Sequence, residues 1–438
     1  MSAPTSEIGY AGGSENGWWA AAALETTPEL MWPHDIAIYD RMVRQDSRVF
    51  STLRAVTLPV MRTKWRVDPF GARDEVVETV AQDLGLPIRG AEDATPPRRT
   101  RGRFSWPEHL QHALLALRYG HMPFEQVYAI DPVTGLARLR KLAPRMPRTL
   151  SAINVADDGG LVSIEQWPSP TTPAHRLGLP TTIPVSRLVM YTNDREAGDW
   201  RGTSLLRSAY KHWVLKDRFL RLQAIAFERN GVGVPRYTGA PKETDLSKGE
   251  KLAQDWRSGS NAGAAIPYGA MLDLVGVSGA IPDADKPIRY HDEQISASVL
   301  AHFLNLGQAS GTGSYALGAS FMDFFTMSLQ TVAENVADTA NAHVVEDMVD
   351  VNFGEDEPAP RLVFDEIGSR HAATAEAIQI LVAAGVLSPD MRLDRFVRES
   401  YGLPGADPAT ARDAPAEAPA ASGTATPQQF GATSVVAP

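Results

Sequence analysis

Cysteine is absent from the 438 residues, which excludes disulfide bonds and metal sites built on thiolates. No run of about 18 apolar residues occurs, so we predict no membrane span. The N-terminus lacks the basic and apolar regions of a secretory signal. The formal net charge of -10 argues against a protein that grips nucleic acid over its whole surface. A protein that surrounds DNA without gripping it stays compatible with this charge.

Signatures of catalysis are also missing. The chain has no phosphate-binding loop of the Walker type, no H-E-x-x-H and no G-x-S-x-G. Gly311–Ala316 fits the loose dinucleotide pattern G-x-G-x-x-A, but that site needs a preceding strand, and here a helix precedes it. His291-Asp-Glu293 offers three metal ligands, yet adjacent helical residues point in different directions. We interpret this stretch as a solvated helix start and predict no catalytic residue, no metal and no cofactor.

Lysine and arginine are missing between Ser320 and Asn352, where the pattern predicts one very long helix. Long surface helices usually alternate charge sign to gain i,i+4 pairs. The acidic stripe on this helix is therefore either a solvated face or a surface that repels phosphate, and it could bind divalent cations if neighbouring copies met. The stripe comprises Glu334, Asp338, Glu346 and Asp350, and the apolar seam comprises Phe325, Leu329, Val332, Val336, Val344, Met348 and Val351.

A second long helix, predicted from Thr203 to Asn230, organises the chain. Thr203 or Ser204 can cap its first amides, and Asn230 with Gly231 supplies a left-handed stop. Two apolar seams require partners on two sides, although a buried helix of a large domain fits the pattern equally. The first seam contains Leu206, Tyr210, Trp213, Leu220, Ala224 and Phe227, and the second contains Leu215, Phe219, Leu222 and Ala226.

The first third of the chain is predicted to be mostly helical. The polar low complexity of residues 1–33 predicts a mobile arm. Its three tryptophans indicate instead that the arm docks on another surface, such as a neighbouring subunit. The arginines at 98–103 lie in a loop that is either solvated, the preferred interpretation, or faces phosphate. Ser105-Trp-Pro-Glu108 is a capping box that begins the last helix of this part. The predicted elements are a helix at 35–58, a strand at 64–69, a helix at 74–84 closed by Gly85, and a helix at 105–120.

Strands dominate the next part, which makes the predicted fold class α+β. Two hairpins and a strand at 187–192 precede the central helix. The hairpins join 124–130 to 136–142 and 153–156 to 161–167 through turns rich in Asp and Gly.

A small insert follows Gly231 and separates the central helix from a returning helix at 295–306. The uncharged, glycine-rich residues 307–319 come next and are expected to be mobile. The insert contains a strand at 232–238, a helix at 246–256 and two short strands within 264–277, and the chain ends in two helices between 372 and 401 and a tail without periodicity.

Seven stretches follow one another in a distinctive order. They are Ile36–Asp46, Arg48–Pro59, Trp65–Val67, Trp106–Tyr128, Gly202–Ser208, Phe227–Pro235 and Val351–Gly354. In this order they resemble a tailed-bacteriophage portal protein of the Mu-like and lambdoid-like branch. The resemblance covers about residues 35–402, and it depends on order and spacing because no single motif is diagnostic.

The resemblance implies a homo-oligomeric ring, usually of twelve subunits, at one capsid vertex. It implies a portal fold with a wing, a two-helix stem, a small α/β clip, a tunnel loop with a long helix, and a helical crown. The arm 1–33 and the disordered tail 403–438 lie outside the resemblance. The resemblance divides the rest of the chain into wing 34–202, stem helices 203–230 and 287–306, clip 231–286, tunnel loop 307–319, channel-to-wing helix 320–354 and crown 355–402.

The implied function is a conduit for packaging and ejecting double-stranded DNA, without catalysis. Such a protein resides in the virion and is assembled in the host cytoplasm. Its implied partners are other copies of itself, the DNA, the terminase large subunit, a head–tail adaptor, the major capsid protein and a scaffold. The alternatives are another capsid-associated ring or adaptor protein, and a nucleotide- or metal-dependent enzyme that uses Gly311–Ala316 or the acidic stripe.

The resemblance also implies three groups of site residues. The acidic stripe would line the channel. The DNA-channel loop would be Gly307, Gln308, Ser310, Gly311, Thr312, Gly313, Ser314 and Tyr315, and the clip residues that dock terminase or connector would be Arg236, Tyr237, Lys242, Tyr268 and Asp273.

Overall fold

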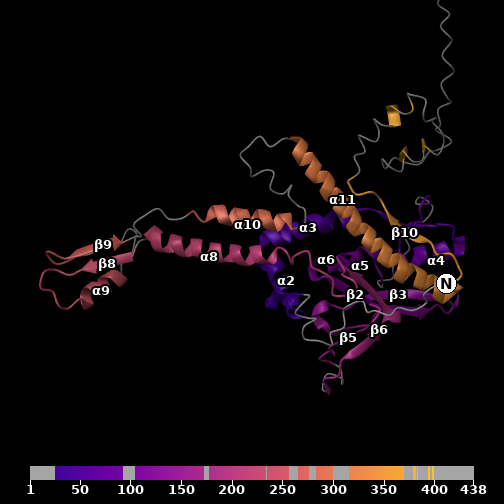
Figure 1. Ribbon diagram of the computed structural model, residues 1–438, viewed down its shortest axis with the longest axis horizontal. Coiled ribbons are helices and arrows are strands. Elements are labelled where there is room, and N and C mark those ends of the chain that lie inside the picture. The colour runs from indigo at the N-terminus through magenta and orange to yellow at the C-terminus, as the bar shows by residue number, and fades with distance from the viewer. Residues whose placement is uncertain are drawn as a thin grey trace, which may run out of the picture. The chain divides into compact units, whose positions relative to one another are not determined.

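The computed structural model divides the chain into two units, residues 1–367 and 368–438. The first unit contains all the helices and strands discussed below, and it mixes helix and sheet as expected (Figure 1). The arginine loop at 98–103, most of the predicted tunnel loop, most of the predicted crown and the tail 403–438 lie outside the described residues. The structure describes residues 25–91, 104–171, 177–232, 234–255, 265–275, 283–298 and 315–368, with isolated residues between 378 and 398.

Two helices replace the single helix predicted at 35–58. They are α2 (His34–Gln45) and α3 (Ser47–Arg62), and the chain turns between them at Asp46. The Asp46 carboxylate accepts hydrogen bonds from the backbone amides of Arg48 (2.8 Å) and Val49 (3.3 Å), so it caps α3. Pro59 lies inside α3 rather than after the helix.

The last part of the predicted arm packs on the same subunit, and residues 1–24 lie outside the described residues. Residues 28–30 form a 3-10 turn, η1 (Pro28–Leu30), and the Leu30 side chain is buried in a core cluster with α2 and α3. Trp32 packs against two of the three core clusters. Residues 25–33 are therefore docked on the body of the protein.

An antiparallel pair joins two strands that lie far apart in the sequence of the first unit. Strand β1 (Trp65–Asp68) pairs with β10 (Arg361–Phe364), and Leu362 lies in the main core. Helix α4 (Asp74–Leu84) ends at Gly85, whose positive φ of 66° provides the predicted left-handed stop. Residues 361–364, which the resemblance assigns to the crown, therefore pair with a strand of the segment assigned to the wing.

Both predicted hairpins are confirmed. Strands β2 (His121–Ile130) and β3 (Ala137–Pro144) join β7 (Leu188–Thr192) in the order β3-β2-β7. A second sheet has the order β4-β5-β6 and contains β4 (Leu150–Val155), β5 (Leu161–Gln166) and β6 (Thr181–Pro184).

The helix predicted at 105–120 is broken into α5 (Trp106–Ala113) and α6 (Ala116–Tyr119). Ser105 makes no side-chain cap hydrogen bond, so the predicted capping box does not form. In the main core, Nε2 of His109 on α5 is hydrogen-bonded to the hydroxyl of Tyr191 on β7 (2.8 Å). Burial lowers the pKa of His109 to about 3.

The long helix without basic residues is confirmed and starts earlier than predicted. It consists of α11 (Tyr315–Ala340), a π-helical turn η5 (Asn341–Val345) and α12 (Glu346–Phe353). Residues 315–319, predicted as loop, are helical. The wider π turn shifts the register of α12, so Val349 is buried while Val351, predicted in the seam, is 61% exposed. The other seam residues are buried or half-buried.

The central helix α8 (Tyr210–Val232) begins at Tyr210 rather than Thr203 and continues past the predicted stop at Asn230-Gly231. It packs along α10 (Asp285–Ala297), which begins ten residues before the helix predicted at 295 (Figure 1). Between them, β8 (Val234–Thr238), α9 (Ser247–Gln254) and β9 (Met271–Val275) form the predicted insert. Of the strands predicted within 264–277, the described residues contain only β9. No helix among the described residues is long and apolar enough to cross a bilayer.

Candidate functional site at the root of the α8–α10 helix pair

A close backbone crossing leads the chain from the sheet to α8. Gly202 has a φ of +59°, and a Cβ built there would lie 2.5 Å from the carbonyl oxygens of both Asn193 and Gly120. Gly120 is also at positive φ, and a Cβ built there would lie 2.4 Å from the carbonyl oxygen of Arg201. Only residues without a side chain allow these three segments to cross, so both glycines fix the path of the chain into α8.

His121 and Ser204 support this crossing. Burial lowers the pKa of His121 to about 4, so its ring is neutral at pH 7 and Nδ1–H donates to the carbonyl of Arg201 (2.9 Å). The Ser204 hydroxyl donates to the carbonyl of Arg118 (2.6 Å) and accepts from the amide of Leu206 (3.0 Å). The predicted capping role of Ser204 therefore serves the turn before α8, not the helix itself.

An ion pair holds the N-terminal segment around Glu25 against the turn before α8. The Arg207 guanidinium donates to both carboxylate oxygens of Glu25, at 2.6 and 2.7 Å. The pKa of Glu25 lies below its usual value although burial acts to raise it, because the hydrogen bond from Arg207 favours the ionised form. Bidentate geometry fixes direction as well as distance.

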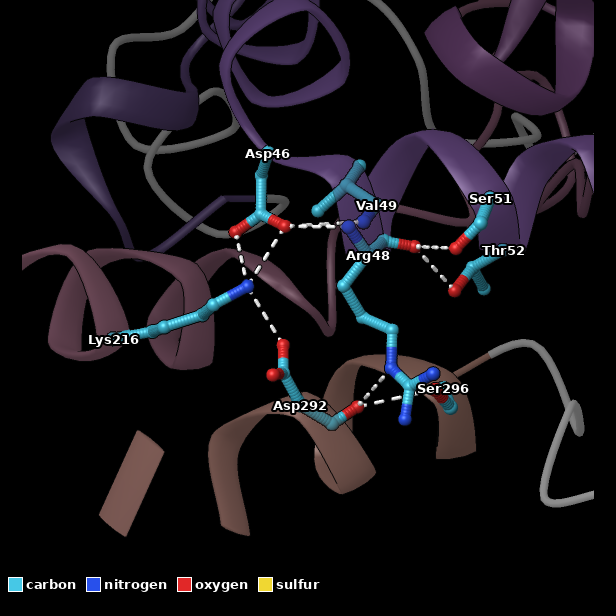
Figure 2. Close-up of polar contacts among 8 residues, drawn as sticks. All are labelled: Asp46, Arg48, Val49, Ser51, Thr52, Lys216, Asp292 and Ser296. Atoms are coloured by element: carbon cyan, nitrogen blue, oxygen red, sulfur yellow. Dashed lines mark hydrogen bonds and ion pairs between the residues drawn. The ribbon is translucent and has the colours of Figure 1, made fainter. Parts of the chain in front are cut away.

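A buried lysine joins three helices at the root of the pair (Figure 2). The Lys216 ammonium on α8 lies 2.9 Å from both carboxylate oxygens of Asp46, which is the N-cap of α3, and 2.6 Å from a carboxylate oxygen of Asp292 on α10. The side chains of Lys216 and Asp46 are each only 8% exposed. We call Lys216, Asp46 and Asp292 the lysine triad.

Arg48 adds a further contact between α3 and α10. Its guanidinium Nε donates to the carbonyl of Asp292 (3.3 Å), and the hydroxyl of Ser296 donates to the same carbonyl (3.1 Å) (Figure 2). A lysine is tolerated at this depth because the carboxylates replace its lost hydration. No pattern in the sequence signals this triad, since its members lie far apart in the chain.

The stretch His291-Asp-Glu293, predicted as a solvated helix start, lies in the middle of α10 and is partly buried. His291 is buried, and its Nδ1 lies 3.1 Å from Nδ1 of His212 on α8, so one ring donates to the other. Phe219 stacks on the His291 ring at 5.7 Å. No group of three potential metal ligands occurs in the described part of the chain.

Beyond the triad, α8 leaves the core. Between Asp217 and Glu228 no side chain is buried. In the first predicted seam, Leu206 and Trp213 lie in a core cluster with α2 and α3, but Leu220 and Phe227 are exposed. Within the second seam, Leu222 is exposed. The half-buried side chains instead follow one stripe along the helix, which comprises Leu215, Phe219, Gln223 and Ala226. Lys216, which contacts Asp292 on α10, lies on the same side of the helix.

The predicted clip residues are only partly brought together. Arg236 and Asp273 lie opposite each other in the β8–β9 register and form an ion pair at 3.5 Å. The Tyr237 hydroxyl contacts the Glu243 carboxylate at 3.0 and 3.1 Å. Lys242 has a positive φ of 80°, and Tyr268 is fully exposed.

The other predicted site residues stand apart from the root. Glu334, Asp338, Glu346 and Asp350 are all exposed. Of the predicted DNA-channel loop, only Tyr315 falls within the described residues, where it begins α11, and Gly307–Ser314 lie outside them.

Comparison with known proteins identifies the family. Residues 36–403 match the family described as portal protein of Mu bacteriophage, and the chain belongs to this family. Among solved structures, the chain is similar to a chain of the virion of a native gene transfer agent (GTA) particle. The identity is 14% and the TM-score 0.55, over 89% of this chain and 99% of that chain.

Two further structures are similar. One is a chain from the neck of the native GTA particle, computed with C12 symmetry (13% identity, TM-score 0.55, 85% of this chain and 95% of that one). The other is an HK97-family phage portal protein from Corynebacterium diphtheriae (12% identity, TM-score 0.41, 76% and 94%). At these identities, the likeness to the two GTA chains concerns the fold.

Proposed function

We propose that the chain is the subunit of a portal ring at one vertex of a phage-like capsid, through which double-stranded DNA is packaged and ejected. The observation that carries this proposal is the family match over residues 36–403. The likeness to chains of a virion and of a neck with C12 symmetry supports a place in the particle and a ring of twelve copies.

In this proposal α8 and α10 are the stem, and the lysine triad is where the stem is fixed to the wing. Ion pairs buried between helices specify geometry more than they add stability. Holding α3, α8 and α10 at one point would give every subunit of a ring the same stem direction. The segment 234–275 between the two helices is then the clip, the docking site for the terminase and for a head–tail adaptor.

The acidic stripe on α11 and α12 is proposed to face DNA in the channel. A protein that neutralises phosphates with cations binds DNA tightly and in a salt-dependent way. A conduit must let the duplex slide, and exposed carboxylates without neighbouring lysine or arginine suit that requirement. The proposed role is structural and without catalysis, and membership of the portal family supports a structural role.

Multi-angle light scattering of the purified full-length chain tests the proposal. We expect a closed assembly with a mass close to twelve subunits. A monomer at micromolar concentration, in buffers between low and physiological salt, would rule out a self-assembling portal ring.

A further inference from the structure

The insert between α8 and α10 has almost no core of its own. Among its residues whose burial the structure describes, 235–255 and 265–275, only Gly249 is buried. Gly249 is buried because α9 lies against the ring of Tyr237, where a Cβ would come within 2.0 Å of the aromatic carbon Cδ1. One glycine under one tyrosine is a small contact, and isolated two-stranded sheets are marginal in water.

Apolar side chains of the insert are left without cover. The exposed ones are Leu246, Ile266, Tyr268, Met271, Leu274 and Val275. Within the part of the insert that the structure describes, β8 and β9 pair only with each other, so each strand has one edge that no other described strand pairs with. Open edges with apolar neighbours are surfaces on which another strand is added.

We propose that these open edges are filled by other copies of the same insert, with β9 of one subunit pairing with β8 of the next. This inference rests on the proposed ring. In a ring, every copy points the same way along the axis. Because β8 and β9 of one chain are antiparallel, β9 is also antiparallel to the β8 of the following copy. The pairing repeats around the ring until no edge remains open.

Charge fixes the register of this pairing. Arg236 and Asp273 occupy the centres of their strands, opposite each other, and form an ion pair while both stay partly exposed. Placing Asp273 opposite Arg236 of the next copy gives alternating charges around the ring, each with an opposite charge on both sides. The same register puts the exposed Met271 opposite Thr238 of the next copy.

The insert therefore folds stably only when subunits assemble. Its strands gain a partner for every backbone edge in the ring, whereas in a monomer they depend on the contact between α9 and Tyr237. Amide hydrogen exchange measures this directly. We expect residues 234–238 and 271–275 to exchange at least about tenfold more slowly in the ring than in a dilute monomer. Equal exchange in the two states, or strong protection in the monomer, would overturn the inference.

The absence of native cysteine allows a test of the partner. Thr238→Cys and Met271→Cys are made in separate chains with tags of different size, which are mixed, assembled and oxidised. We expect a disulfide between the two kinds of chain, because cross-strand neighbours lie within disulfide range. Neither variant alone should crosslink to itself. Val133→Cys, on the exposed β2–β3 turn, replaces Met271→Cys as the control and should give no crosslink.

The two failures can be told apart. Rings that form without the Thr238–Met271 crosslink and without slowed exchange refute the pairing of inserts while the portal ring stands. Absence of rings in light scattering, with wild-type protein, refutes the proposed function itself.

Discussion

The side chain of Asn341 pairs with both backbone groups of Leu362. Its amide nitrogen donates to the Leu362 carbonyl (3.2 Å), and its carbonyl oxygen accepts from the Leu362 amide (2.7 Å). Asn341 opens the π-helical turn η5, and Leu362 lies on the edge strand β10. One side chain thus satisfies an open strand edge inside the core, and ties the long helix to β10.

Replacing Asn341 with alanine is predicted to destabilise the fold strongly. Both backbone groups of Leu362 would stay buried without partners, at about 1–3 kcal/mol each. Asn335→Ala, at an exposed position of α11, is the matched control and should change the free energy of unfolding by less than about 0.5 kcal/mol. Chemical denaturation gives both values, and equal effects would refute the role given to Asn341.

The lysine triad predicts a large cost for Lys216→Met. Methionine keeps most of the side-chain volume but removes the ammonium that Asp46 and Asp292 share, which costs about 3–5 kcal/mol for a buried pair. Arg221→Met removes an ion pair with Asp217 in which both side chains are at least half exposed, so we expect at most about 0.5 kcal/mol.

A combined variant separates charge from packing. Adding Asp46→Asn and Asp292→Asn to Lys216→Met removes the uncompensated charges, and Asn at 46 can still cap α3. We expect the combined variant to recover much of the lost stability. If it is no more stable than Lys216→Met alone, the loss comes from packing and the electrostatic account of the triad fails.

The backbone crossing predicts unequal effects of two glycine substitutions. Gly135→Ala places a Cβ at a positive φ with nothing within 4 Å, so we expect only the conformational cost of about 1–2 kcal/mol. Gly202→Ala adds contacts of 2.5 Å with two carbonyl oxygens. We expect at least about 2 kcal/mol more, seen as a lower midpoint in thermal or chemical unfolding. Equal costs would mean that the crossing relaxes freely.

Asp35 predicts a pH dependence that a substitution should remove. Burial raises the pKa of its carboxyl from 3.8 to about 7, and Oδ1 has no hydrogen-bond partner in the described structure. Between pH 3.8 and about 7, the Asp35 carboxyl is therefore protonated in the folded protein and ionised in the unfolded chain. Because of this difference, Asp35 lowers the free energy of unfolding as the pH rises through this range.

The Asp35→Asn variant should match wild type near pH 4 and become more stable above it. The gain grows by about 1.4 kcal/mol per pH unit until it levels off near pH 7. Urea unfolding of both proteins from pH 4 to pH 8 measures the difference. A difference that is constant across this range would show that the carboxyl does not titrate with a raised pKa.

If the acidic stripe faces DNA, lysine substitutions within it should make the ring bind DNA more tightly. Glu334→Lys with Asp338→Lys should raise the affinity of assembled rings for double-stranded DNA and steepen its salt dependence. Glu355→Lys with Asp356→Lys changes the charge equally on an exposed turn after α12. Filter binding at several salt concentrations compares them, and equal slopes for the two variants would mean that net charge alone acts.

Local patterns in the sequence predicted much of the fold. Gly85 ends α4 as expected because a glycine stop acts within one turn. The β2–β3 turn was predicted because Asp131 and Gly135 determine it locally, with the Gly135 amide bonded to the Asp131 carbonyl at 2.8 Å. The helix boundary at Tyr210 was missed because residues 203–205 bond to the main chain of other segments. Ser204 and Leu205 bond to α6, and Thr203 bonds to Asn193, the residue after β7.

Contacts between distant residues could not be predicted. Asp46 looked like one polar residue in a continuous helical pattern, yet it ends one helix, caps the next and binds Lys216 on α8. The portal resemblance supplied the family because order and spacing persist where single motifs do not. It gave no sign of the triad or of the ion pair between Glu25 and Arg207, because each depends on three-dimensional packing.

Electron microscopy of the purified wild-type chain in negative stain tests the central claim most directly. The account predicts end-on views of closed rings with a stain-filled axial hole wide enough for a DNA duplex, and twelvefold symmetry in their class averages. Monomers, or closed particles without an axial hole, would contradict it.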